Sequence, residues 1–175
     1  MGAVDQWFDL DLLAELARLR PSWRFEIVGG LEDVKREIPR LPNVRFRGER
    51  PHREMPEILS LFDVEIIPFR LSPLTHATDP VKLYEAAAAG RAVVSSPMRS
   101  LEPLTARGLV RFASTASEFA LAIEAAAAEG EEAALRRRAF ARENTWNERA
   151  ATLEAWIANP AEGDRGLAAE GAERS

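Results

Sequence analysis

Residues 79–97, DPVKLYEAAAAGRAVVSSP, join a predicted helix to a predicted strand. Asp79 is placed to cap this helix with its carboxylate, and Pro80 suits the first helical position, where a missing N–H costs no hydrogen bond. Gly90 is typical of the residue after a helix, because glycine tolerates a left-handed backbone. The apolar run at 92–95 has the composition of a buried strand. This stretch therefore predicts a helix over 79–89 and then a strand, as in a βαβ unit.

The same alternation extends outward in both directions along the chain. Strands that alternate with helices form parallel βαβ units, with helices on both faces of one sheet. We therefore predict a single α/β domain over 1–158, a Rossmann-like, doubly wound and mostly parallel sheet, followed by a disordered tail at 159–175. The predicted strands are 23–28, 43–47, 64–69, 92–95 and 109–113; the predicted helices are 9–19, 33–38, 54–61, 79–89, a helix capped by Ser117 and reaching 128, and 131–158 with a bend near Asn144; 71–78 is predicted to be a loop.

Composition excludes several classes of protein. The 175 residues contain no cysteine, which excludes disulfides and thiolate metal sites and is compatible with a cytoplasmic location. The net charge of −5 argues against a nucleic-acid partner. The sequence contains no apolar run long enough to span a membrane and no signal segment, although peripheral association through a larger parent enzyme stays open. The four tryptophans, Trp7, Trp23, Trp146 and Trp156, are predicted to be packing anchors.

Ligands of doubly wound sheets bind at the carboxyl ends of the strands, so the loops after Val28, Arg47, Phe69 and Ser95 are the places to search. Gly29-Gly30 lacks the third glycine of a dinucleotide fingerprint, and no His, Asp and Glu set has metal-ligand spacing. We therefore expect neither a cofactor nor a metal.

The helix predicted over 79–89 has the features of an anion site. Its first N–H groups are unpaired and carry partial positive charge, which favours a phosphate. Lys82 lies in the first turn, and Glu85 lies three residues further on the same face. The pair suits a nucleotide-sugar pocket, in which a carboxylate accepts hydrogen bonds from hydroxyls. A surface ion pair is the alternative.

The stretch at 79–97 resembles the donor-site signature of the retaining GT-B glycosyltransferases called glycosyl transferases group 1. Glu85, Ala88 and Gly90 match that signature, and Ala92 replaces its usual proline. The resemblance continues upstream through LPNVRFRGERPHREMPEILSLFDVEIIPF and downstream in ARENTWNERAATLEAWI, where Trp146 and Arg149 match a closing Ser-Trp-x-x-Arg helix. It covers roughly 1–158 and implies the C-terminal, donor-binding half of a two-domain enzyme.

The resemblance implies particular roles for particular residues. Glu85 would hold the ribose of a nucleoside-diphosphate sugar, and Lys82 would face its diphosphate without a bound metal. The remaining implied donor-binding residues are Asp79, Pro80 and Val81 at the diphosphate, Gly48, Glu49 and Arg50 around the base, and Gly2, which would allow a close approach to the phosphates. A plain turn glycine at Gly48 and a flexible terminus at Gly2 are the alternatives.

Two departures from the family pattern bear on function. Ala77 stands where the family often has a second glutamate, so His76 or Thr78 would have to replace its hydrogen bond, unless both lie in a solvated loop. Only residues 1–4 remain of the expected first strand, which implies a fragment without its N-terminal acceptor domain. We expect hexosyl transfer that needs this missing domain. A non-catalytic α/β regulatory or assembly module, or an epimerase of similar architecture, stays open.

Overall fold

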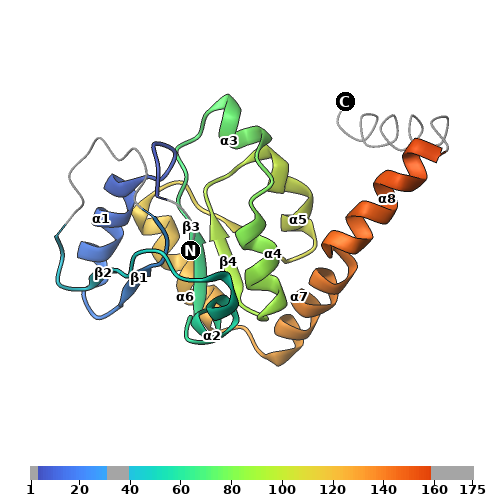
Figure 1. Ribbon diagram of the computed structural model, residues 1–175. Helices are drawn as coiled ribbons and strands as arrows, with labels where there is room; N and C mark the ends of the chain where they lie inside the picture. The colour runs from blue at the N-terminus through green and yellow to red at the C-terminus, as the bar shows by residue number, and fades with distance from the viewer. Residues whose placement is uncertain (1–3, 31–39, 159–175) are drawn as a thin grey trace.

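The computed structural model describes residues 4–30 and 40–158, and it has the predicted α/β architecture (Figure 1). All five predicted strands are present, and every strand pair is parallel. The strands are β1 Phe25–Ile27, β2 Val44–Phe46, β3 Val64–Ile67, β4 Ala92–Ser95 and β5 Arg111–Phe112. β1 pairs with β2, and β3, β4 and β5 pair in that order. The fold is therefore a Rossmann-like α/β arrangement of parallel strands and helices.

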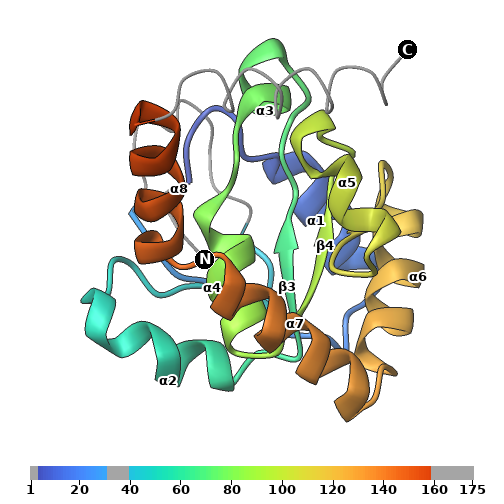
Figure 2. The same cartoon turned by 90° about the vertical axis from the view of Figure 1, so that its right-hand side faces the viewer.

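Helices cover both faces of the strands (Figures 1 and 2). α1 and α6 lie on one face, and α4, α5 and α7 lie on the other, while α8 projects from the body. The helices are α1 Leu10–Leu19, α2 Met55–Ser60, α3 Pro73–Ala77, α4 Val81–Ala88, α5 Glu102–Ala106, α6 Ala116–Ala127, α7 Glu131–Glu143 and α8 Trp146–Ala158, with short 3₁₀ turns η1 His52–Glu54 and η2 Arg99–Leu101.

The side chains of each strand point alternately to the two faces of the sheet, and this divides the core into two layers. In β4, Ala92 and Val94 face the layer of α1 and α6, whereas Val93 faces the layer that contains Leu83 of α4. Successive side chains of a strand point to opposite faces, and all four residues of β4 are buried. β4 is therefore the central strand on which α4 packs.

The sheet is not continuous, which differs from the single sheet predicted from the sequence. β1 and β3 belong to separate parallel groups, although both contribute to a shared core. The segment before α1 connects the groups only at their carboxyl ends, where the Val4 N–H donates to Gly30 and the Asp9 N–H donates to Pro68. Because these described residues form isolated bonds and no full strand, they do not join β1 to β3.

Three local predictions about where helices begin were wrong. The predicted loop at 71–78 contains α3, in which Ser72 forms a capping box with Thr75. Thr115, not Ser117, caps α6 through a second capping box with Glu118. Asp79 does not cap α4, whose first turn has no side-chain cap at all. The predicted break in the last helix is confirmed between α7 and α8.

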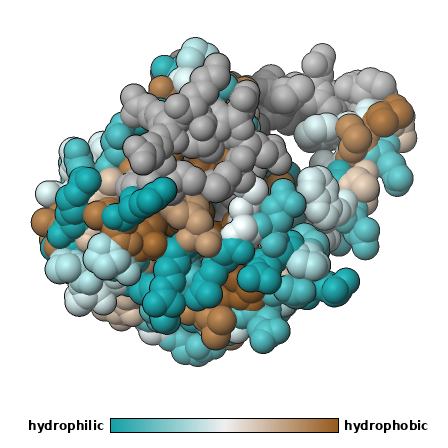
Figure 3. All heavy atoms as spheres, turned by 60° about the vertical axis from the view of Figure 1, so that its left-hand side comes forward, coloured by the Kyte–Doolittle hydropathy of each residue, from teal (hydrophilic) through white to brown (hydrophobic). Residues whose placement is uncertain are grey.

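The prediction that all the tryptophans are packing anchors was wrong for two of them. Trp146 is 72% exposed and Trp156 is 47% exposed, and both belong to α8, which buries none of its residues. Apolar side chains are visible on this projecting arm in Figure 3. The helix predicted at 33–38, the tail at 159–175 and Gly2 lie outside the described residues. No described helix is long and apolar enough to cross a membrane.

Candidate functional site

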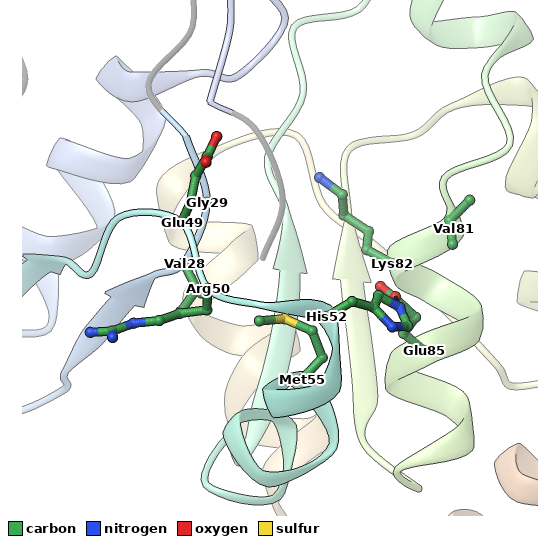
Figure 4. Close-up of a pocket in the computed structure, with 9 residues that line it drawn as sticks. All are labelled: Val28, Gly29, Glu49, Arg50, His52, Met55, Val81, Lys82 and Glu85. Atoms are coloured by element: carbon green, nitrogen blue, oxygen red, sulfur yellow. Dashed lines mark hydrogen bonds and ion pairs between the residues drawn. The ribbon is translucent and has the colours of Figure 1, made fainter.

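A pocket of about 360 Å³ lies at the carboxyl ends of β1 and β2, opposite the start of α4 (Figure 4). Nine residues line it, and they come from three regions that are distant in the sequence. They are Val28 and Gly29 after β1, Glu49, Arg50, His52 and Met55 after β2, and Val81, Lys82 and Glu85 of α4. Five of them, Glu49, Arg50, Val81, Lys82 and Glu85, are among the residues that the sequence assigned to donor binding.

Two glycines shape the strand side of the pocket. The Gly29 N–H donates to the Gly48 carbonyl at 2.9 Å, which ties the loop after β1 to the loop after β2. Gly48 has a φ of +68°, a conformation that L side chains rarely adopt. The chain turns there and presents Glu49 and Arg50 to the pocket. In Figure 4 the side chain of Arg50 extends away from Lys82 and Glu85.

α4 forms the opposite wall because its two sides differ in polarity. Leu83, Ala86 and Ala87 are buried against the body, whereas Val81, Lys82 and Glu85 face the pocket. Residues three and four apart lie on the same side of a helix, so Val81 and Glu85 follow one another along the wall. The prediction that Lys82 and Glu85 share a face of the helix is confirmed.

Lys82 is half-buried, and its surroundings shift its pKa. The ammonium lies 4.7 Å from the centre of the Phe69 ring, a cation–π distance. Burial lowers the pKa of Lys82 from its ordinary value of 10.5, while the carboxylates of Glu65 and Glu85 act in the opposite direction. Glu65 is itself almost fully buried in β3. A ligand phosphate would add the negative charge that favours the protonated amine.

Glu85 has a neighbour in the pocket that the sequence analysis did not assign to the site. The Glu85 Oε1 atom lies 3.3 Å from the Nε2 atom of His52, which is 88% exposed. Met55 is buried and brings its thioether to the same side of the pocket (Figure 4). Both residues follow Pro51, His52 in η1 and Met55 at the start of α2, directly after the loop that follows Arg47 and that the fold had already marked as a place to search. Their spacing from Glu85 in the sequence gives no signal of this contact.

Four of the predicted site residues do not line the pocket, although they are close in the sequence to residues that do. They are Gly48, Thr78, Asp79 and Pro80. The Thr78 hydroxyl donates to the Leu74 carbonyl within the turn of α3. His76 lies in α3 and not in a loop, and its Nδ1 accepts from the Arg99 N–H at 3.2 Å.

The Asp79 carboxylate is turned toward α8. Its Oδ2 accepts hydrogen bonds from Arg149 at 3.0 Å and from the Tyr84 hydroxyl at 3.2 Å. This placement explains why Asp79 does not cap α4.

The pocket combines groups that suit a phosphorylated polyol. A helix start and a lysine can stabilise negative charge, a carboxylate can accept hydrogen bonds from hydroxyls, and Val28 and Met55 provide an apolar surface. Within residues 4–30 and 40–158, no group of three His, Asp or Glu side chains is arranged to hold a metal ion.

Comparison with known proteins identifies the class to which this fold and pocket belong. The chain matches the family "Glycosyl transferases group 1" over residues 7–129. This match covers more than half of the sequence and includes every residue that lines the pocket. The chain therefore belongs to the glycosyl transferases group 1 family.

A relative in sequence agrees with the family assignment, and a solved structure agrees with the fold. The chain is 36% identical over 104 residues to "Putative teichuronic acid biosynthesis glycosyltransferase TuaH" of Bacillus subtilis (strain 168), a match that covers 57% of this chain and 26% of the relative. The crystal structure of the glycotransferase of kitacinnamycin is similar in fold, with a TM-score of 0.57 and 19% identity over 88% of this chain and 42% of that one. The matched regions thus cover less than half the length of either protein.

Proposed function

We propose that this chain provides the donor-binding half of a glycosyltransferase and that its pocket holds a nucleoside-diphosphate sugar. The observation that carries this proposal is the position of Lys82 and Glu85 on one wall of a pocket whose other wall is the loop after β2. The pocket lies at the carboxyl ends of parallel strands, where doubly wound folds bind nucleotides.

Each wall would contact a different part of the donor. Glu85 would accept hydrogen bonds from the two ribose hydroxyls, and the backbone of Glu49 and Arg50 would frame the base above Met55. Lys82 and the first turn of α4 would face the diphosphate. When the glycosidic bond to the diphosphate breaks, negative charge grows on the leaving phosphate. The Lys82 ammonium and the helix N-terminus would stabilise that charge without a metal ion.

The transferred group and its acceptor would lie at the open side of the pocket. We propose hexosyl transfer to an acceptor held by a second domain, since donor-binding halves of this kind close against a partner around the substrate. By this proposal the 175-residue chain binds nucleotide weakly and does not turn over donor alone.

Calorimetric titration with UDP, GDP and ADP, without added metal, tests the proposal. We expect saturable binding of one nucleotide, weakened about 10- to 100-fold by Glu85→Gln, which removes charge-assisted hydrogen bonds and keeps the side-chain shape. Glu132→Gln is the matched control, because Glu132 is an exposed glutamate on α7 that pairs only with Arg136 among its described ion pairs. If a folded chain bound none of the three nucleotides, a non-catalytic α/β module would become the better account.

A further inference from the structure

Arg149 of α8 forms a cluster with two residues that flank the first turn of α4. Its Nη1 donates to the Asp79 Oδ2 at 3.0 Å, and its guanidinium lies 4.3 Å from the centre of the Tyr84 ring. The Tyr84 hydroxyl donates to the same Asp79 oxygen, and the Tyr84 ring stacks on Phe140 of α7. One arginine therefore connects α8, Asp79 in the segment just before α4, and the partly buried Tyr84 of α4.

The start of α4 depends on such tertiary contacts, because it lacks the usual local one. No side chain caps its first turn, and Pro80 occupies the N-cap position. The Leu83 N–H donates to the Pro80 carbonyl. The missing cap leaves the N–H groups before it available to a ligand, but it also leaves the turn without a side-chain anchor. Tyr84 lies between Lys82 and Glu85 in the sequence, so a contact that holds Tyr84 also restrains the turn that carries both pocket residues.

Charge gives Arg149 a second consequence for the same site. Asp79 comes two residues before Val81, which lines the pocket, and its carboxylate would repel a bound diphosphate. The Arg149 guanidinium neutralises that carboxylate at hydrogen-bond distance. The Asp79 side chain is 43% exposed and the Arg149 side chain is 38% exposed, so the ion pair itself adds little stability. Its local charge balance still acts on an anion at the helix start.

We propose that Arg149 is a positioning residue for the donor pocket, holding the first turn of α4 through Tyr84 and neutralising Asp79 so that a diphosphate can bind beside it. This inference rests on the proposed function for its ligand, and it gives α8 a role in donor binding although α8 lies outside the pocket. On the same face of α8, the Trp146 ring lies 5.9 Å from the Arg149 guanidinium. Leu153 and Trp156, four and seven residues after Arg149, are exposed.

A double-mutant cycle tests the electrostatic part. In the 175-residue chain, Arg149→Gln should weaken the binding of whichever of UDP, GDP and ADP binds by about three- to tenfold. The corresponding nucleoside, followed by NMR shifts, should lose less than about twofold, because it carries no phosphate charge. Asp79→Asn should restore most of the diphosphate affinity in the Arg149→Gln background. Arg136→Gln, which breaks an exposed ion pair on α7, should change neither value.

Hydrogen exchange tests the positioning part without any ligand. Arg149→Gln should speed exchange at the amides of Lys82 to Glu85 and along α8, and Arg136→Gln should not. Equal losses for the nucleoside and the diphosphate, or no rescue by Asp79→Asn, would overturn the electrostatic role, and unchanged exchange at α4 would overturn the positioning role. If the wild-type chain bound no nucleotide, the proposed function and the electrostatic role would both be refuted, while hydrogen exchange would still decide whether Arg149 holds α4.

Discussion

The two sides of α4 carry different kinds of residue although they belong to the same eight-residue helix. On the buried side, Leu83, Ala86 and Ala87 are at most 3% exposed and pack against β4 and α7. On the pocket side, Val81 is 47% exposed and Lys82 and Glu85 are only partly covered. Packing accounts for the apolar side, where small alanines allow neighbouring elements to approach closely. It gives no reason for the lysine and glutamate on the other side, which a ligand would supply.

The largest expected effect is on the buried side. Leu83 is fully buried in the layer that includes Ile67 and Val93, so Leu83→Ala should lower the free energy of unfolding by about 2–5 kcal/mol. Urea denaturation followed by circular dichroism measures the change. Val81→Ala is the matched control on the pocket side and should cost less than about 1 kcal/mol, because much of that side chain is already in water. Equal losses would show that both sides of α4 belong to the core.

On the pocket side, Lys82→Met should reduce nucleotide affinity and spare stability. Methionine keeps the length of the stem and its contact with Phe69, but it removes the charge that would face the diphosphate. We expect the Kd for the nucleoside diphosphate to rise about tenfold, which corresponds to about 1.4 kcal/mol. Burial of the ammonium is unfavourable in the free chain, so the free energy of unfolding should stay the same or rise. A loss of stability with unchanged Kd would contradict a ligand-binding role for Lys82.

The pKa of Lys82 predicts opposite pH trends for stability and binding. Because burial lowers this pKa, the folded chain holds fewer protons than the unfolded chain at pH values between the lowered pKa and 10.5. The contribution of Lys82 to stability should therefore rise with pH in this window, whereas nucleotide affinity should fall as the amine loses its charge. Both trends can be isolated by measuring the free energy of unfolding and the nucleotide affinity against pH for the wild type and for Lys82→Met, and taking the difference. Lys82→Arg should remove the alkaline loss of affinity, since arginine stays protonated there. A parallel loss in both variants would assign the pH effect to another group.

The sequence predicted the order of elements better than the contacts between them. Its alternating apolar runs identified all five described strands, because local burial patterns and turn residues carry that signal. α3 was missed because Ser72 and Thr75 form a capping box that outweighs the loop-like composition around Pro73. The gap between β1 and β3 could not be predicted, since strand pairing depends on residues distant in the sequence.

The candidate site shows the same distinction. The spacing within one helix predicted the common face of Lys82 and Glu85, and the family resemblance assigned both residues to donor binding. Asp79 looked like a local helix cap, but Arg149, 70 residues away, competes for its carboxylate. His52 was not assigned to the site, because no spacing rule connects it to Glu85, which the fold brings within 3.3 Å. Local rules therefore predicted the helix wall of the pocket and missed the contacts made across it.

The smallest expected effect concerns that contact between His52 and Glu85. The imidazole occupies one oxygen of the carboxylate that we propose to bind ribose, so the two compete. Because His52 is 88% exposed, the contact is weak, and His52→Ala should tighten nucleotide binding by only about two- to threefold, roughly 0.5 kcal/mol. Calorimetry at one pH and one salt concentration resolves such a change when the variants are measured side by side.

His76→Ala is the matched control for this substitution. His76 lies in α3 and accepts from the Arg99 amide outside the pocket lining, so its loss should leave the Kd within error of wild type. The sign of the His52→Ala effect carries the information. Tighter binding would mean that His52 competes with the ligand for Glu85. The contact between His52 and Glu85 would then form only when the pocket is empty. Weaker binding would contradict that competition and would make His52 a direct contact of the nucleotide, on the side of the pocket opposite α4.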